Sequence, residues 1–447
     1  MSHFIPITPE EKKEMLKKIG VKNFEELINT IIPEEIRLKG ELDLPESLSE
    51  LEVKREVEKI ANLNVSTDSF INFMGAGAYD HFIPSAVFHI ISRPEFYTAY
   101  TPYQAEASQG TLQALYEYQS MICELMEMDI ANSSMYDGGT AIAEACRMAL
   151  AIKKGEKVLV AGTLHPYYLR CIKTYLSEEK VLICPEKGGQ IDIEKLDELM
   201  KDACAFVCQS PNFYGVLEEV FDISEIVHKN GGLLIAVPLP ISLGLLSPPG
   251  EYDADIVACE GQTLGLPLNF GGPYLGILCA RREFIRYMPG RIIGRTVDKD
   301  GKDAFCMVLQ TREQHIRRAR ATSNICTNQT LCAIASAVYL ALMGKEGLRE
   351  VAELCMQKAH YLAEKIEEIE GFNLKYKKPF FNEFVVETPL PALEICEKLK
   401  DKKIFAGVPL SKFYPEREKE LLIAVTEKRT KCELDNFVEL LNTFKVA

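Results

Sequence analysis

The sequence predicts an α/β protein built around a mainly parallel β-sheet. Its 447 residues are 47% hydrophobic and 26% charged, which is ordinary globular usage and provides enough apolar material for a large buried core. Between residues 157 and 281, short β-branched runs alternate with amphipathic helical segments, as in KVLVAG, HPYYLRCIKTYL, VLICPE and DIEKLDELMKDA. Such alternation is typical of βαβ units and of a parallel sheet. Sheets of this kind bind ligands beyond the carboxyl ends of their strands.

Three regions are predicted along the chain. Residues 1–65 are expected to form a helical arm, because Glu/Lys-rich helical patterns such as EEKKEMLKKI are separated there by single prolines. Residues 66–349 are expected to form the large α/β domain, which ends in the apolar helical segment CTNQTLCAIASAVYLALMG. Residues 350–447 alternate strand and helix patterns in a small α+β domain. A long helix, LREVAELCMQKAHYLAEKIEEIEG, is predicted to link the two.

The composition argues against several classes of protein. Lys+Arg number 51 against 65 Asp+Glu, and 51 − 65 gives a net charge of −14, which does not suit a nucleic-acid binder. No run of about 18 apolar residues and no signal-peptide core is visible, so we expect a cytoplasmic protein without a membrane span. The 14 cysteines include no CxxC pair and are expected to be buried free thiols. The histidines form no HExxH motif and no Cys/His cluster, so no metal site is predicted.

Two segments place polar residues just before predicted helices. Gly138, Gly139 and Thr140 precede the helical pattern IAEACRMALAIKKG, and paired glycines at a helix start allow an anion to approach exposed N–H groups. A phosphate cradle and a plain tight turn explain this segment equally well. The segment 99–110, YTPYQAEASQG with the preceding Ala99, suits either a polar pocket wall or a helix start whose tyrosines pack on the core.

Two later segments are also candidates for a site. The glycine-rich loop at 261–274 follows the predicted strand DIVACEG, where an irregular backbone favours the lining of a crevice over a structural hairpin. The stretch 312–324 is the densest basic run of an acidic chain and ends in Thr322, Ser323 and Asn324. It indicates either an anion-binding site or a solvated, ion-paired face. His165 before Pro166 is interpreted as a helix-start residue and not as a ring-stacking group.

Four motifs in a fixed order resemble the glycine dehydrogenase (decarboxylating) family, the P-protein of the glycine cleavage system. They are YTPYQAEASQG, YDGGTAIAEA, GQTLGLPLNFGGPYLG and TREQHIRRARATSNICT. Each motif is weak alone, but the ordered set is specific, and the resemblance covers nearly the whole chain. The length corresponds to the N-terminal half of the family's long single-chain form, which in many prokaryotes is a separate first subunit.

The resemblance implies a fold and a chemistry. The family has the aspartate-aminotransferase-like fold of pyridoxal-phosphate enzymes (fold type I), here with a large α/β domain, a small C-terminal α+β domain and the helical N-terminal arm. The implied cofactor is pyridoxal phosphate, whose pyridine ring is the electron sink for the decarboxylation of glycine. The implied acceptor of the aminomethyl group is the oxidised lipoyl arm of the H-protein.

The chain lacks the lysine that this chemistry requires. Such enzymes hold the cofactor through a Schiff-base lysine on a loop after a sheet strand. No lysine occurs between Gly231 and Asp298, and the position that matches the family's lysine, five residues before Pro267, is Gln262. The acidic partner of the pyridinium nitrogen is also absent, because Pro238, Leu239 and Pro240 follow the strand LLIAV.

These gaps lead to the hypothesis that the chain completes an active site whose lysine belongs to a homologous second subunit, in an α2β2 assembly. Pyridoxal phosphate would be bound covalently by that partner and not by this chain. The residues expected to line the partner's pocket are Tyr100, Thr101, Tyr103, Thr322, Ser323 and Asn324, and those of a vestigial phosphate cradle are Gly138, Gly139 and Thr140. Two alternatives stay open: a non-catalytic scaffold or regulatory pseudoenzyme, and an independent pyridoxal-phosphate decarboxylase that uses Lys153 or Lys299.

Overall fold

The computed structural model describes residues 6–40 and 42–444. It divides into two compact units, Met1–Val65 and Ser66–Ala447. The N-terminal unit contains three α-helices and a short 3-10 turn, none of which has a buried residue: α1 (Pro9–Ile19), α2 (Phe24–Ile31), η1 (Glu34–Ile36) and α3 (Glu50–Ala61). Capping boxes begin two of these helices, with Thr8 and Glu11 at α1 and Ser49 and Glu52 at α3. The N-terminal segment is therefore helical, as predicted.

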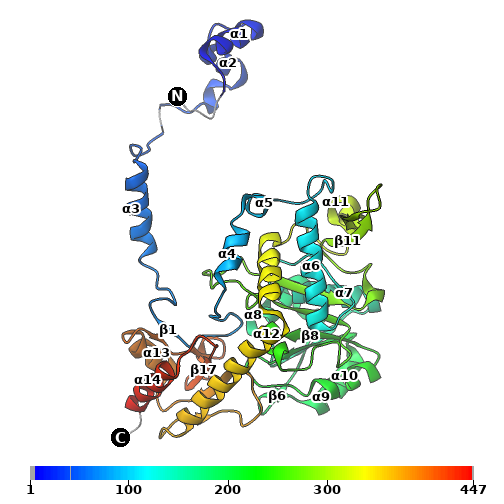
Figure 1. Ribbon diagram of the computed structural model, residues 1–447, viewed down its shortest axis with the longest axis vertical. Helices are drawn as coiled ribbons and strands as arrows, with labels where there is room; N and C mark the ends of the chain where they lie inside the picture. Colours follow the sequence, from blue (N-terminus) through cyan, green and yellow to red (C-terminus); the bar gives the residue numbers. More distant parts are fainter. Residues whose placement is uncertain (1–5, 41, 445–447) are drawn as a thin grey trace. The chain divides into compact units, whose positions relative to one another are not determined.

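The second unit is organised by a seven-stranded sheet with the strand order β2-β10-β9-β8-β7-β3-β4 (Figure 1). Its strands are β2 (Ile130–Ala131), β3 (Val158–Ala161), β4 (Val181–Cys184), β7 (Ala205–Ser210), β8 (Leu233–Pro238), β9 (Ile256–Glu260) and β10 (Gly276–Ala280). The block from β9 to β4 is parallel, whereas β10 pairs antiparallel with both β9 and β2. The sheet is therefore mixed, with an antiparallel edge that the mainly parallel prediction did not include.

Helices pack against this sheet and complete its core. The α7 helix lies against β8, β9 and β10, and α10 lies against β7 and β8. Strands β3 and β8 are buried along their whole length, as expected for strands covered on both faces. The helices of this region are α4 (Ser85–Ile91), α5 (Pro94–Tyr97), α6 (Gln109–Met126), α7 (Gly138–Lys153), α8 (Pro166–Leu176), α9 (Ile193–Leu199), α10 (Val220–Lys229) and α11 (Gln314–Arg317).

The longest helix, α12 (Thr330–Glu367), is interrupted at Gly344. Gly344 has φ 57° and ψ −170°, a backbone conformation outside the helical region that glycine adopts without a steric penalty. The two helices predicted on either side of this glycine are thus both present and meet at a kink. By length and composition α12 could cross a membrane, but it packs against α4, α6 and the 3-10 segment η4 (Pro240–Gly244) within the core. A buried core helix satisfies the same test.

The C-terminal part of this unit has its own antiparallel sheet, ordered β13-β14-β17-β16. Its elements are β13 (Asn373–Leu374), β14 (Glu383–Glu387), α13 (Ala392–Lys400), β15 (Ile404–Phe405), β16 (Val408–Pro409), β17 (Glu420–Ala424) and α14 (Lys431–Leu441). A separate apolar cluster, which includes Phe384 and Phe437, stabilises this part. Residue 350, the expected domain boundary, lies inside α12. Three two-stranded sheets complete the fold: β1 (Ile71–Asn72) with β15, β5 (Glu186–Lys187) with β6 (Gln190–Ile191), and β11 (Ile292–Val297) with β12 (Asp303–Val308).

Candidate functional site

A small cavity lies at the carboxyl ends of β7, β8 and β9, where the sequence places a ligand site. The register pairs Ser210 at the end of β7 with Pro238 at the end of β8, so the loops that follow these strands start side by side. The residues around the cavity include Tyr79, Tyr168, Leu239, Glu260 and Glu383. Its volume is about 30 Å³. That is room for about one water molecule, whereas small-molecule sites usually measure roughly 300–1,000 Å³.

Gln262 is the residue that the sequence predicts at the position of the family's lysine, and its amide connects two main-chain segments. Its side chain is 0% exposed. The Oε1 atom accepts a hydrogen bond from the Tyr79 N–H at 2.9 Å, and the Nε2 atom donates to the Tyr79 carbonyl at 2.9 Å and the Leu266 carbonyl at 2.8 Å. All of these bonds join Gln262 to backbone. The residue is therefore structural in this chain, and none of the residues that line the cavity is a lysine.

Glu260, the last residue of β9, fills the position beside the start of α7. Its carboxylate accepts hydrogen bonds from three backbone N–H groups, those of Gly138 at 2.9 Å, Gln262 at 3.0 Å and Leu275 at 3.0 Å. Burial raises the pKa of Glu260 to about 8, although the three N–H groups act in the opposite direction. A Cβ atom on Gly138 would lie 2.8 Å from the Glu260 Cβ, so this close approach requires glycine.

The predicted cradle at 138–140 therefore has little donor capacity left. The Gly138 N–H donates to Glu260, and the Thr140 N–H donates to the side chain of Asp137 at 2.8 Å. Asp137 and Thr140 form a reciprocal capping box that begins α7. Gly139 faces Tyr168 and Cys171, where a Cβ would make ordinary contacts. The segment is thus a capped helix start whose first N–H is already bonded within the chain.

The other positions singled out near the cavity have clear local roles. His165 is the N-cap of α8, with its Nδ1 accepting from the Tyr167 N–H at 3.1 Å and its Nε2 2.8 Å from the Ala76 carbonyl. Burial lowers the pKa of His165 to about 4, which keeps the ring neutral at neutral pH. Leu239 lies at the cavity and offers no charge to a ring nitrogen. The interpretation of His165 as a helix-start residue agrees with this geometry.

A second group of residues joins the segment 99–110 to the turn at 326–328, just after the basic stretch, and Arg291 is at its centre. Arg291 is only 4% exposed. It donates to Tyr103 Oη at 3.3 Å, to the Cys326 carbonyl at 2.5 Å and to Asn328 Oδ1 at 3.0 Å, and its guanidinium lies 5.6 Å from the centre of the Tyr103 ring. Among the described residues, no carboxylate lies within ion-pair distance of it. Its positive charge is buried without a compensating acid.

Thr322 and Ser323 are held by the side chains of α7. Arg147 donates to the Thr322 carbonyl at 2.8 Å and lies 3.5 Å from Glu144. The Ser323 hydroxyl accepts from the Ile325 N–H at 3.0 Å, and burial raises the pKa of Glu144, the acid beside Arg147. Ser323 is therefore occupied within its own turn. Asn324 beside it is exposed.

The tyrosines of the segment 99–110 are exposed at the surface. Tyr100 is 75% exposed and Tyr103 is 55% exposed, while Thr101 is half-buried. Neither tyrosine packs in the core, so the alternative of core-packed tyrosines is wrong. Glu260, Arg291 and Arg147 were not predicted from the sequence. An acid directly after an apolar strand and an arginine at the start of the next β-branched run were the available signals.

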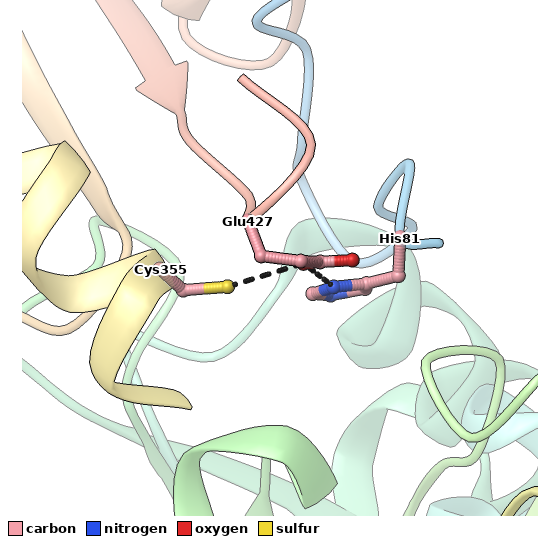
Figure 2. A group of neighbouring side chains, drawn as sticks. All are labelled: His81, Cys355 and Glu427. Atoms are coloured by element: carbon pink, nitrogen blue, oxygen red, sulfur yellow. Dashed lines mark hydrogen bonds and ion pairs between the residues drawn. The ribbon is translucent and has the colours of Figure 1, made fainter. Parts of the chain in front are cut away.

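A buried cluster of His81, Cys355 and Glu427 joins three distant segments (Figure 2). Cys355 comes from α12, Glu427 follows β17, and His81 lies in the segment before α4. The His81 Nδ1 and Glu427 Oε2 atoms are 2.6 Å apart, and the Cys355 thiol donates to the same oxygen at 3.4 Å. The Phe82 N–H donates to the other oxygen at 2.6 Å. These distances describe hydrogen bonds to a carboxylate. The cluster therefore links three segments that are far apart in the sequence.

The Glu427 carboxylate should make stability depend on acid pH. Burial alone would raise its pKa, but the hydrogen bond from His81 and its charge lower the pKa to about 2, below the ordinary 4.5. Such a carboxyl stabilises the fold fully above pH 4.5 and loses that contribution as the pH falls toward 2. We expect Glu427→Gln to unfold at lower urea concentration than the unsubstituted chain at pH 7, with the difference shrinking below pH 4.5. A difference that is constant from pH 7 to pH 4 and below would contradict the role of this charge.

The fold matches that of glycine decarboxylase and of aminotransferase-like enzymes of pyridoxal-phosphate fold type I. Alanine–glyoxylate aminotransferase from Nostoc sp. superposes with a TM-score of 0.58 at 16% identity, over 85% of this chain and 96% of that one, which is a likeness of fold alone. A crystal structure of glycine decarboxylase (P-protein) of the glycine cleavage system, in inhibitor-bound form, superposes with a TM-score of 0.91. It is 41% identical and covers 99% of this chain and 100% of its own.

Sequence comparison gives the family. The glycine cleavage system P-protein family model matches residues 2–441. The probable glycine dehydrogenase (decarboxylating) subunit 1 of Chlorobium phaeobacteroides is 54% identical over 446 residues, which are 99% of this chain and 100% of that protein. The chain belongs to the glycine cleavage system P-protein family. The resemblance stated from the four motifs is confirmed.

Proposed function

We propose that the chain is the lysine-free subunit of a two-subunit glycine decarboxylase. A homologous second subunit binds pyridoxal phosphate covalently, the pair decarboxylates glycine, and the aminomethyl group passes to the lipoyl arm of the H-protein. The assembly is an α2β2 tetramer in the cytoplasm. The observation that carries the proposal is Gln262, whose amide is bonded to backbone on all sides at the position of the family's lysine. An amide cannot form an imine.

The geometry of the cavity supports the same proposal. About 30 Å³ is too little for the cofactor, Leu239 provides no acid for its ring nitrogen, and Glu260 already uses the Gly138 N–H. The residues of this chain therefore do not fit covalently bound pyridoxal phosphate. The relative from Chlorobium carries the name subunit 1, which implies that it has another subunit. We infer the same arrangement for this chain.

In this proposal the chain contributes one wall of the active-site pocket of the partner subunit. Tyr100 and Tyr103 are exposed, and Arg291 ties Tyr103 to the turn at 326–328. Exposed aromatic hydroxyls on a rigid support are suited to orient a polar ligand held by another subunit. We propose that this surface, with Thr101, Thr322 and Asn324, faces the cofactor pocket of the partner.

An independent decarboxylase based on Lys153 or Lys299 fits the structure poorly. Lys153 ends α7, and 15 residues of helix place it about 20 Å from the N-terminus of that helix at the cavity. Lys299 belongs to the turn between β11 and β12. Neither residue lines the cavity.

Borohydride reduction tests the proposal directly. The purified pair, and each subunit alone, would be incubated with pyridoxal phosphate, reduced, digested and mapped by mass spectrometry. We expect one stoichiometric pyridoxyl-lysine in the partner and none in this chain, because the reduction fixes only imines. A stoichiometric pyridoxyl-lysine at any one position of this chain would overturn the proposal. Full glycine decarboxylation by this chain alone would overturn it as well.

A further inference from the structure

We propose that the carboxyl group of Glu260 is an internal substitute for a phosphate group. It occupies the anion site at the start of α7 and so closes this chain's own cavity to phosphate-bearing ligands. The inference concerns one cavity in the isolated chain and does not depend on the activity proposed above.

The three hydrogen-bond donors around Glu260 converge from separate parts of the fold. The Gly138 N–H is at the N-terminus of the 16-residue helix α7, the Gln262 N–H belongs to the turn after β9, and the Leu275 N–H precedes β10. Convergent backbone N–H groups at a helix N-terminus are the usual arrangement for binding phosphate. Here both acceptor oxygens come from the chain itself.

The donors around Glu260 support the same interpretation. Among the described residues, no Lys, Arg or His side chain lies within ion-pair distance of its carboxyl group, which is bonded to backbone N–H groups instead. All three donors to Glu260 are main-chain N–H groups, whereas two of the three donors to the buried Glu218 are side chains, those of Thr163 and Asn212. Main-chain N–H groups at a helix start are the donors that bind phosphate groups in proteins.

The space beside Glu260 is limited by its own side chain. The cavity of about 30 Å³ lies against Glu260, Tyr168 and Leu239. Removal of the atoms beyond Cβ would join their volume to this cavity and would release the three N–H groups. We expect this change to open a polar cavity at the start of α7 that admits a small tetrahedral anion, with Gln262 and Leu239 still in place beside it.

The test uses the full-length chain with inorganic phosphate as the probe. Glu260→Ala would be compared with the unsubstituted chain and with Glu218→Ala by calorimetric titration and by thermal unfolding at constant ionic strength. Glu218 is the matched control, because it is also buried and accepts from three groups, Asn212 Nδ2, Thr163 Oγ1 and the Ile191 N–H, but lies away from α7. Glu260→Ser is a second variant that retains a small polar side chain if the alanine variant does not fold.

We expect the Glu260 variants to bind phosphate at least about tenfold more tightly than the other two proteins, since one freed hydrogen bond to an anion is worth about that factor. Their Tm should rise with phosphate concentration. Equal binding by all the proteins would overturn the inference, because the phosphate would then bind elsewhere. Tight binding by the unsubstituted chain would show that Glu260 does not close the site, and absence of binding by folded Glu260→Ala and Glu260→Ser would show that no anion site exists there.

Discussion

Replacement of Arg291 by methionine will lower kcat for glycine decarboxylation by the assembled two-subunit enzyme by about a hundredfold. Arg291 is a positioning residue: it bonds Tyr103 Oη, the Cys326 carbonyl and Asn328 Oδ1 from one buried guanidinium. Methionine fills similar space but makes none of these bonds, so the 99–110 segment and the turn at 326–328 lose their common support. Displacement of a pocket wall by about 1 Å is enough for a loss of that size.

The loss should appear in kcat more than in KM, and Arg291→Lys should recover only part of it. Lysine keeps the charge but cannot reach two acceptors with a planar fork. The control is Arg295→Met in the same hairpin, where an exposed arginine pairs with Asp303 at 2.8 Å. We expect normal activity from it, because exposed ion pairs contribute little. Full activity of Arg291→Met in a normally assembled tetramer would favour the scaffold alternative.

The sequence predicted the elements of the fold better than their pairing. The runs at β7, β8 and β9 are buried strands, and their alternation with helices predicted the parallel block. The antiparallel edge was not predictable from β10, because the five residues of this strand do not encode which neighbour they pair with. Likewise, Gly344 separates two helical patterns, but only its φ of 57° shows that they meet at one kink.

The residues of the candidate site also differ in whether the sequence alone could predict their roles. The absence of lysine between Gly231 and Asp298 is a property of the sequence alone and was visible there. The role of Glu260 depends on Gly138, 122 residues away, and the role of Arg291 depends on Tyr103, 188 residues away. Contacts at such separation are made by the fold and leave no local pattern. The predicted roles of Thr322 and Asn324 toward a partner remain predictions.

Substitution of Gln262 by leucine will lower the free energy of unfolding by about 3 kcal/mol, since it removes three hydrogen bonds to buried main-chain groups and leaves two of these groups without a partner. The groups left without a partner are the Tyr79 N–H and the Leu266 carbonyl, bonded at 2.9 and 2.8 Å in the unsubstituted chain, whereas the Tyr79 carbonyl still accepts from the His81 N–H at 3.2 Å. Leucine has a similar volume, so the cost is one of lost hydrogen bonds and not of an empty cavity. Urea denaturation of the full-length chain at pH 7 measures it.

Gln113→Leu is the control for this substitution. Gln113 lies exposed on α6 and bonds only Glu117, at 2.9 Å, so its replacement should change the unfolding free energy by less than about 0.5 kcal/mol. Equal stability of the two variants would mean that the amide of Gln262 is dispensable. Residue 262 would then have no structural role, and other side chains, lysine included, would be tolerated there. A large loss confined to Gln262→Leu shows instead that the amide of Gln262 holds the segment at Tyr79 against the loop after β9.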